Sequence, residues 1–297
     1  MQTHKYMEAI KTTRLSKYYG EHIGIKDVSL TINKGEVFGF IGPNGAGKST
    51  AIRTLLGLLI PTSGSAQILG HDIVKEGKEI RKKIGYLPSE VHYYDEMSSR
   101  ELLAYSSRFY GEENPAEIER LAEMFELDLD KKITDLSFGN KKKCAIIQST
   151  IHQPELLILD EPTSGLDPLM QNRFFELLEA ENEKGTTIFF SSHILSEIQR
   201  MCDRAAIIRK GEITAVENIQ ALLEKQMKKV RLVFKERPGK LVLPEGSQHE
   251  KWHDNKLSFE YVGMVKPLLQ FLNELDLIDA VLEEPDLESI FMNYYER

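Results

Sequence analysis

The sequence predicts an α/β fold built on a mainly parallel sheet, and three observations lead to this prediction. An apolar strand over residues 37–41 runs directly into a glycine-rich loop, and a helical pattern follows the loop. A second run, residues 156–159, is wholly apolar, as expected of a strand buried on both faces of a parallel sheet. Between them, residues 88–152 have helical patterns. We therefore expect a parallel sheet that carries a helical insertion.

Length and composition limit the possible functions. The chain has 297 residues and a formal net charge of −8, which fits one large domain with a small one and argues against general nucleic-acid binding. No apolar run approaches the roughly 18 residues that span a bilayer, and no secretory signal opens the chain. We therefore expect any membrane role to depend on a separate chain. Cys144 and Cys202 lack metal-ligand spacing and are predicted to be reduced, buried thiols.

The N-terminal elements follow from local patterns. Residues 8–34 favour strands, and residues 28–32 alternate apolar and polar side chains with period two. After the strand at 37–41 and its glycine-rich loop, a helix is expected over residues 50–59, ended by Pro61.

The insertion at about 88–152 is predicted to contain three helices. Ser98 or Ser99 can cap the first helix, whose apolar periodicity covers residues 102–110. Pro115 suits the first turn of the second helix, which runs to Phe125. The third helix is expected over residues 141–152.

The alternation of strands and helices then resumes. Its expected elements are, in order, a helix at 169–184, a strand at 187–190, a helix at 194–202 and a strand at 205–208. Beyond about residue 217 the pattern changes to strands at 230–234, 257–261 and 278–282 and helices at 264–275 and 287–295. We therefore predict one domain over residues 7–224 and a small α+β domain over residues 225–297.

The segment Gly-Pro-Asn-Gly-Ala-Gly-Lys-Ser at 42–49 matches the phosphate-binding loop pattern at every defined position. Glycines let successive backbone amides point at phosphate oxygens, and the helix that follows adds its positive dipole end. Lys48 is predicted to reach the β- and γ-phosphates of ATP, and Ser49 to ligate Mg²⁺. The expected ATP-binding residues are Gly42, Pro43, Asn44, Gly45, Ala46, Gly47, Lys48, Ser49 and Thr50.

Two adjacent carboxylates follow the buried strand at 156–159. In open α/β sheets, ligands bind at the carboxyl ends of the strands, and this is where Asp160 and Glu161 are expected. Asp160 is predicted to hold Mg²⁺, and Glu161 to polarise the attacking water as a general base.

Three further segments occur in a family-specific order with these two motifs. Leu-Ser-Phe-Gly-Asn at 136–140 lies between them, and Ser-Gly-Leu-Asp at 164–167 and Ser-His at 192–193 follow them. Over about residues 9–215, this series resembles the ABC ATPases, with their Walker A, signature, Walker B, D-loop and switch-histidine motifs. The resemblance implies a P-loop NTPase of ABC type, in which an antiparallel β subdomain accompanies the parallel sheet.

The resemblance also implies a head-to-tail dimer with two ATP molecules at its interface. In such a dimer, Ser137 and the amide of Gly139 contact the γ-phosphate bound on the opposite subunit, and Asp167 couples the two sites. His193 contacts the γ-phosphate or holds the attacking water. Tyr19 resembles the aromatic residue that stacks on adenine, with Tyr18 as the alternative.

The sequence departs from the family pattern in two places. The signature reads LSFGN where the family usually has LSGGQ, so Phe138 replaces a glycine and Asn140 a glutamine. In the segment that resembles the Q-loop, Ser89 stands at the position of the glutamine. Ser89 can approach the metal through a bridging water, and Glu90 is a rival with a longer reach. A loop that never touches the metal is the third possibility.

Within the family, the short C-terminal segment ending in Asp-Leu-Glu-Ser-Ile-Phe at 286–291 is most similar to ATPase subunits of ABC-2-type exporters of drugs, antibiotics and bacteriocins. The implied partners are a second copy of the chain or a paralogous ATPase, and an integral membrane permease. Through the permease the chain is expected at the cytoplasmic side of the cell membrane. No nucleic-acid partner is expected.

Other functions within the family were weighed against this one. Chromosome-organising members insert coiled coils between the phosphate loop and the signature, but no heptad run lies between Lys48 and Ser137. Translation factors carry two ATPase units, whereas this chain has one phosphate loop. A non-catalytic regulator is compatible with Ser89 but not with Glu161 and His193. Maltose-type importer subunits usually have a larger C-terminal domain.

Overall fold

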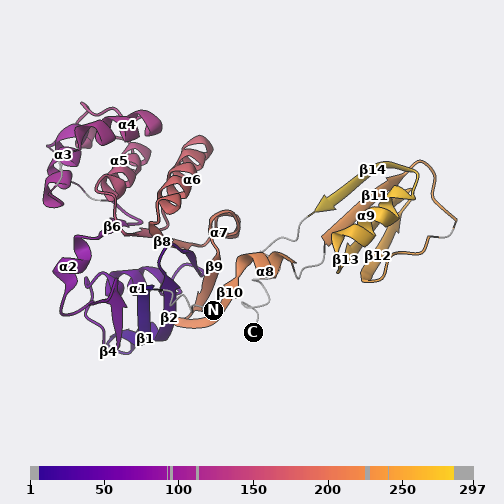
Figure 1. Cartoon of the computed structure of the whole chain (residues 1–297), viewed down its shortest axis with the longest axis horizontal. Helices are drawn as coiled ribbons and strands as arrows, with labels where there is room; N and C mark the ends of the chain where they lie inside the picture. The colour runs from indigo at the N-terminus through magenta and orange to yellow at the C-terminus, as the bar shows by residue number, and fades with distance from the viewer. Residues whose placement is uncertain are drawn as a thin grey trace, which may run out of the picture. The chain divides into compact units, whose positions relative to one another are not determined.

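A computed structural model describes residues 7–91, 93, 96–111, 114–224, 228–239 and 241–283. The chain divides into two compact units, residues 1–216 and 217–297 (Figure 1). This division falls a few residues before the domain boundary that we expect from sequence, which lies at the end of helix α8 (Ile219–Glu224). Each unit has its own core, described separately below.

The first unit contains an antiparallel four-stranded sheet in the order β2-β1-β4-β5. Its strands are β1 (Glu8–Tyr19), β2 (His22–Asn33), β4 (Ser63–Ile68) and β5 (His71–Asp72). Strands β1 and β2 pair with Ile10 opposite Ile32, and both side chains are buried. The predicted strand character of residues 8–34 is therefore confirmed, and the sheet is the antiparallel β subdomain of the predicted fold.

The second sheet of this unit has six strands in the order β10-β9-β3-β8-β7-β6. They are β10 (Glu212–Asn218), β9 (Arg204–Arg209), β3 (Val37–Ile41), β8 (Thr187–Ser192), β7 (Leu156–Asp160) and β6 (Ile84–Leu87). The pairings β9–β3, β3–β8, β8–β7 and β7–β6 are all parallel. Every residue of β3, β7 and β8 is buried, as the apolar runs predict.

Helix α1 (Lys48–Leu55) packs between the two sheets and shares one hydrophobic core with both. It begins two residues earlier and ends four residues earlier than the sequence predicts. Gly47 stands before it with a left-handed φ of 108°, so the helical turn starts at Lys48. Gly57, with φ 69°, ends it because a left-handed residue cannot continue an α-helix. The stop therefore comes from Gly57, before Pro61.

The helical insertion contains α3 (Ser99–Phe109), α4 (Pro115–Phe125), the short 3₁₀ helix η1 (Ile133–Asp135) and α5 (Phe138–Thr150). Ser98, not Ser99, caps α3, and Glu101 completes a capping box with it. Pro115 opens α4 as predicted. Helix α5 begins three residues before the prediction because the Ser137 hydroxyl accepts a hydrogen bond from the Asn140 amide, 3.3 Å away.

Helices α6 (Pro168–Glu183) and α7 (Leu195–Met201) complete the first unit as expected. The sequence patterns do not reveal α2 (Gly77–Arg81) or strands β4, β5, β6 and β10. Strand β4 shows why: it is rich in small polar residues, and it becomes a strand through its antiparallel pairing with β1.

The second unit begins with α8 and continues with a four-stranded antiparallel sheet in the order β12-β13-β11-β14 and a further helix (Figure 1). Its elements are β11 (Lys228–Phe234), β12 (Ser247–His253), β13 (Lys256–Tyr261), α9 (Val265–Asn273) and β14 (Leu277–Glu283). Leu268 of α9 packs on the buried side chains of β11 and β13. The predictions at 286–291 and 287–295 lie outside the described residues.

We find no helix, among those that the structure describes, that is both long and apolar enough to cross a membrane.

Candidate nucleotide-binding site

The glycine-rich loop leaves the carboxyl end of β3 and leads into α1. At Gly47 the backbone needs a glycine for two reasons, because φ is 108° and a Cβ atom would lie 2.5 Å from the carbonyl oxygen of Gly24. Lys48 is buried, and its Nζ donates hydrogen bonds to the carbonyl oxygens of Gly42 at 2.7 Å and Pro43 at 3.2 Å. The loop thus curls around its own lysine, which leaves the start of α1 facing the cleft.

Asp160 ends β7 next to the end of β8. It is fully buried, and the hydroxyl of Ser191 donates a 2.8 Å hydrogen bond to its Oδ1. Its Oδ2 is buried and has no hydrogen-bond partner among the described residues. A buried carboxylate oxygen without a donor is costly unless a cation or water meets it. Oδ2 of Asp160 and the hydroxyl group of Ser49, at the start of α1, are both oxygen ligands of the kind that Mg²⁺ prefers.

Glu161 is the point where the separate sequence motifs meet. Its Oε1 lies 3.2 Å from Nζ of Lys48 and 3.4 Å from Nδ1 of His193. Its backbone has a left-handed φ of 47°, which is strained for a residue with a side chain. Its amide is held by Ser191 at the end of β8. The structure therefore brings the predicted phosphate-binding lysine, general base and switch histidine together around one carboxylate oxygen.

A buried glutamate on α7, which our sequence reasoning did not single out, supports this arrangement. Glu197 accepts 2.6 Å hydrogen bonds from the hydroxyl groups of Thr163 and Ser192. Thr163 follows Glu161 by two residues and Ser192 precedes His193, so one carboxylate braces both loops. The signal in the sequence is a glutamate one helical turn after the histidine, and it is too common a pattern to be read alone.

A cleft of about 940 Å³ opens between these loops. Its lining includes Tyr19, Ser89, Glu90 and Glu161, and also six residues of the phosphate loop and the start of α1: Asn44, Gly45, Gly47, Lys48, Ser49 and Thr50. Tyr19 is half exposed there, whereas Tyr18 does not line the cleft. Ser89 and Glu90 both remain candidates for the Q-loop role by position.

The signature segment forms the start of α5. Ser137 caps this helix and is exposed, and the backbone of Gly139 follows in its first turn. Phe138 is 58% exposed, and its ring lies so close to Gly165 that a Cβ atom there would sit 2.1 Å from Cε1. Asp167 caps α6 by accepting a hydrogen bond from the amide of Met170. Ser137, Gly139 and Asp167 do not line the cleft of their own chain.

Lys142 was also missed, because the sequence shows it as one of three consecutive lysines. It is 1% exposed, and its Nζ donates to the carbonyl oxygens of Pro88 at 2.9 Å, Ser89 at 3.3 Å and Glu161 at 3.4 Å. Burial lowers the pKa of Lys142 to about 8, although the nearby charges of Asp160 and Glu161 act in the opposite direction.

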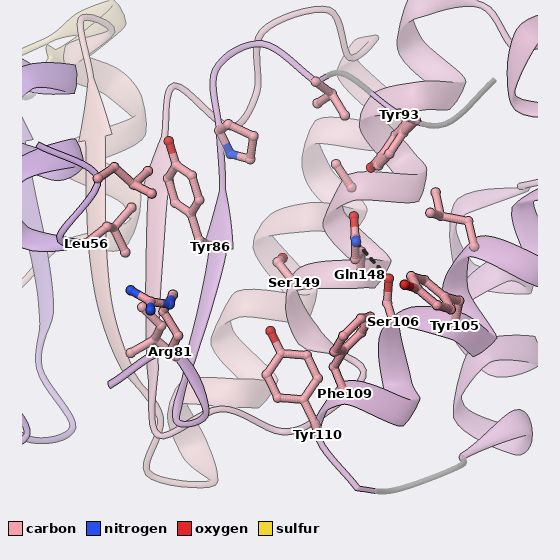
Figure 2. Close-up of a pocket in the computed structure, with 16 residues that line it drawn as sticks. Leu56, Arg81, Tyr86, Tyr93, Tyr105, Ser106, Phe109, Tyr110, Gln148 and Ser149 are labelled. Carbon is pink, nitrogen blue, oxygen red and sulfur yellow. Dashed lines mark hydrogen bonds between the residues drawn. The ribbon is translucent and has the colours of Figure 1, made fainter. Parts of the chain in front are cut away.

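A second cavity, of about 630 Å³, lies beside β6 and the helical insertion (Figure 2). Its wall combines aliphatic side chains with aromatic ones, which include Tyr86 on β6, Tyr105 and Phe109 on α3, and Tyr110 directly after α3. Phe109 is 69% exposed, and its ring meets that of Tyr105 edge to face. Ser106 and Gln148 are joined by a 2.8 Å hydrogen bond across its floor. We call this cavity the aromatic groove.

Comparison with known proteins agrees with this site. Residues 25–164 match the family described as ABC transporter. The bacitracin transport ATP-binding protein BcrA of Bacillus licheniformis is 33% identical over 95% of this chain and 96% of its own length. The linearmycin resistance ATP-binding protein LnrL of Bacillus subtilis is 37% identical over 70% of this chain and 68% of its own length.

Solved structures lead to the same family. A dimeric bacterial ABC transporter cassette matches with a TM-score of 0.66 and 27% identity over 71% of this chain and 98% of the cassette. A post-hydrolysis dimer of that cassette, bound to ADP and Pi, matches with a TM-score of 0.65 and 26% identity. The chain belongs to the ABC transporter ATP-binding proteins, and it is an ATPase of the P-loop NTPase fold.

Proposed function

We propose that the chain dimerises head to tail around two ATP molecules and that ATP hydrolysis drives a separate membrane permease that exports a drug or antibiotic. The observation that carries this proposal is the division of the site. Lys48, Glu161 and His193 meet at one carboxylate oxygen. Ser137 and Gly139, at the start of α5, do not line this cleft, although the Phe138 side chain between them does. A helix N-terminus attracts phosphate, so it suits a nucleotide held by another chain.

In this proposal each residue around the cleft has a distinct task. The loop amides and Lys48 hold the phosphates, and Tyr19 stacks on the adenine. Ser49 and Asp160 would ligate Mg²⁺. The bound ion would neutralise negative charge on the β- and γ-phosphate oxygens. Glu161 polarises the attacking water. His193 steadies the carboxylate of Glu161, 3.4 Å away, and contacts the γ-phosphate.

The names of the relatives support the export proposal. BcrA is named for bacitracin transport and LnrL for linearmycin resistance, and both are ATP-binding proteins. The aromatic groove supports the proposal that the chain binds a membrane permease. Its exposed aromatic side chains suit an apolar segment of a permease at the cytoplasmic face of the membrane. Docking there would place the chain at that face.

The test is complementation between two inactive variants. Glu161→Gln removes the general base, and Ser137→Ala removes the signature contact. In a head-to-tail dimer of one of each, one site carries both lesions and the other carries neither. Mixing the two purified variants before ATP is added should therefore restore ATPase activity that neither variant has alone.

A site contained within one chain predicts no recovery in the mixture. The control is a variant that carries both substitutions, because its mixture with either single variant contains no intact site. Dimerisation is checked separately by measuring sedimentation of Glu161→Gln with and without ATP. A monomer at all ATP concentrations, together with absent complementation, would contradict the proposed dimer.

A further inference from the structure

Lys142 joins two loops that the sequence keeps far apart. Its ammonium group lies within hydrogen-bonding distance of Pro88 and Ser89 in the loop after β6, and of Glu161 in the turn after β7. An ammonium group has three N–H donors, and three backbone carbonyl oxygens are placed to receive them. The side chain therefore links helix α5 to two segments that line the cleft, at Ser89 and at Glu161.

The surroundings of Lys142 are unusual for a lysine. Lysine is almost never fully buried without a paired carboxylate, yet the described residues place no carboxylate oxygen within ion-pair distance of its Nζ. Burying a charge is costly, so an apolar side chain at this position would serve packing better. The hydrogen bonds to three carbonyl groups are the feature that an apolar residue cannot reproduce.

Each of the two linked segments has a part in the proposed mechanism. Glu161 holds a strained, left-handed backbone conformation, with its amide bound by Ser191 and its carbonyl group by Lys142. Pro88 lines the aromatic groove, and Ser89 lines the nucleotide cleft. One side chain therefore connects this loop to the backbone of Glu161.

We propose that Lys142 is a positioning residue that ties the loop at 88–89 to the catalytic turn at Glu161. The short side chain of Ser89 is unsuited to connect these two segments. Lys142 connects them by donating hydrogen bonds to their backbone carbonyl groups. The proposal rests on the proposed function, because it assigns Glu161 the role of general base. Lys142 itself touches no reacting atom.

The test compares Lys142→Met and Lys142→Gln with the neighbouring control Lys143→Met in the full chain. Methionine keeps the length but donates no hydrogen bond, whereas glutamine keeps two N–H donors. The measurements are kcat, the Kd of a fluorescent ATP analogue, and hydrogen exchange of peptides that cover residues 88–91 and 161–164. A small misplacement of a catalytic group can cost up to about 10²-fold in rate.

We expect kcat to fall by about tenfold or more in Lys142→Met, less in Lys142→Gln, and not in Lys143→Met. The Kd should change by less than about threefold, because Lys142 does not line the cleft. Exchange should rise in both peptides together and not across the whole unit.

Two results would overturn the proposal. One is a kcat within about twofold of wild type in Lys142→Met. The other is exchange that rises throughout the first unit, with glutamine no better than methionine, since this pattern marks a general packing role. Failure of the proposed role of Glu161 is distinguishable: Glu161→Gln would then keep near-wild-type turnover, while the paired exchange of the two peptides would still report on the link through Lys142.

Discussion

The nucleotide cleft and the aromatic groove lie in the same unit but have linings of different chemistry. The cleft takes most of its lining from a few short segments, with glycines, hydroxyl groups and charged side chains. The groove also draws on a few segments, within residues 56–58, 81–93, 102–110 and 145–149, but its wall is mainly aromatic and apolar. The cleft is thus visible in the sequence as motifs, whereas the groove is not.

This difference follows from what each cavity would hold. A phosphate group needs backbone amides and a cation at fixed positions, so successive residues of one loop must be of particular types. An apolar protein segment needs area and shape, which many side chains can supply from different elements. Variants of the two cavities should therefore affect different measurements.

The largest effect is expected in the cleft, for Glu161→Gln. The amide keeps the shape of the side chain but cannot accept the proton of the attacking water. Removal of a general base typically costs about 10²–10⁴-fold in rate, so kcat should fall by this factor while ATP still binds. Steady-state ATPase assays and nucleotide titration measure the two quantities. Near-normal turnover would remove Glu161 from the catalytic role.

In the groove, Phe109→Ser should act on the partner and spare the chemistry. Phe109 is largely exposed, so its loss costs the isolated chain little, whereas an aromatic anchor in an interface can contribute about 2 kcal/mol or more. We expect co-purification with the membrane subunit to be lost. The basal ATPase activity of the chain should stay within about twofold of wild type.

The matched control for the groove is Val74→Ser, which changes an exposed apolar residue that does not line it. This variant should keep the membrane subunit. If both variants lose the membrane subunit, or neither does, the groove is not the docking surface.

The next smaller effect is expected from a variant that disturbs the contact between Phe138 and Gly165. Gly165→Ala adds a Cβ atom where the ring lies and places alanine at φ 80°. The left-handed conformation alone should lower the free energy of unfolding by about 1–2 kcal/mol. Displacement of the ring should also disturb the signature and reduce ATPase activity. Adding Phe138→Gly should restore activity but not the stability lost to backbone strain.

Gly185→Ala separates these two contributions. Gly185 has a φ of 100° and no atom within 4 Å of the added Cβ, so it carries the strain without the contact. Urea denaturation and ATPase assays of the three variants measure both effects. If Phe138→Gly does not rescue Gly165→Ala, the contact has no part in placing the signature.

The smallest effect is expected at the Q-loop position, where Ser89→Ala and Glu90→Gln are compared across Mg²⁺ concentration. Ordering a bridging water beside Ser89 costs up to about 2 kcal/mol, which offsets part of what the contact contributes, so the shift in Mg²⁺ dependence should be modest. A shift in Ser89→Ala alone supports the water bridge, and a shift in Glu90→Gln alone assigns the contact to Glu90. With no shift in either, the loop is not a metal contact.

The sequence predicted the elements that have a clear apolar pattern and missed those that lack one, for reasons that particular residues illustrate. Runs such as β7 are apolar throughout, so burial can be read directly. Strand β4 and strand β12 have no such pattern and exist through pairing with β1 and β13. Helix ends differ from the predicted ones where a local feature sets them. Examples are the Ser137 cap at the start of α5 and the left-handed Gly57 after α1.

The amino-acid sequence by itself determined the phosphate loop, the Asp160–Glu161 pair, the order of the motifs and hence the family. Each of these depends on neighbouring residues, whose geometry the chain fixes locally. Only the tertiary structure decided that Lys142 is buried, that Glu197 braces two loops and that scattered aromatic residues form a groove. These features depend on which distant segments the two sheets and the helical insertion bring together, and no local pattern encodes that packing.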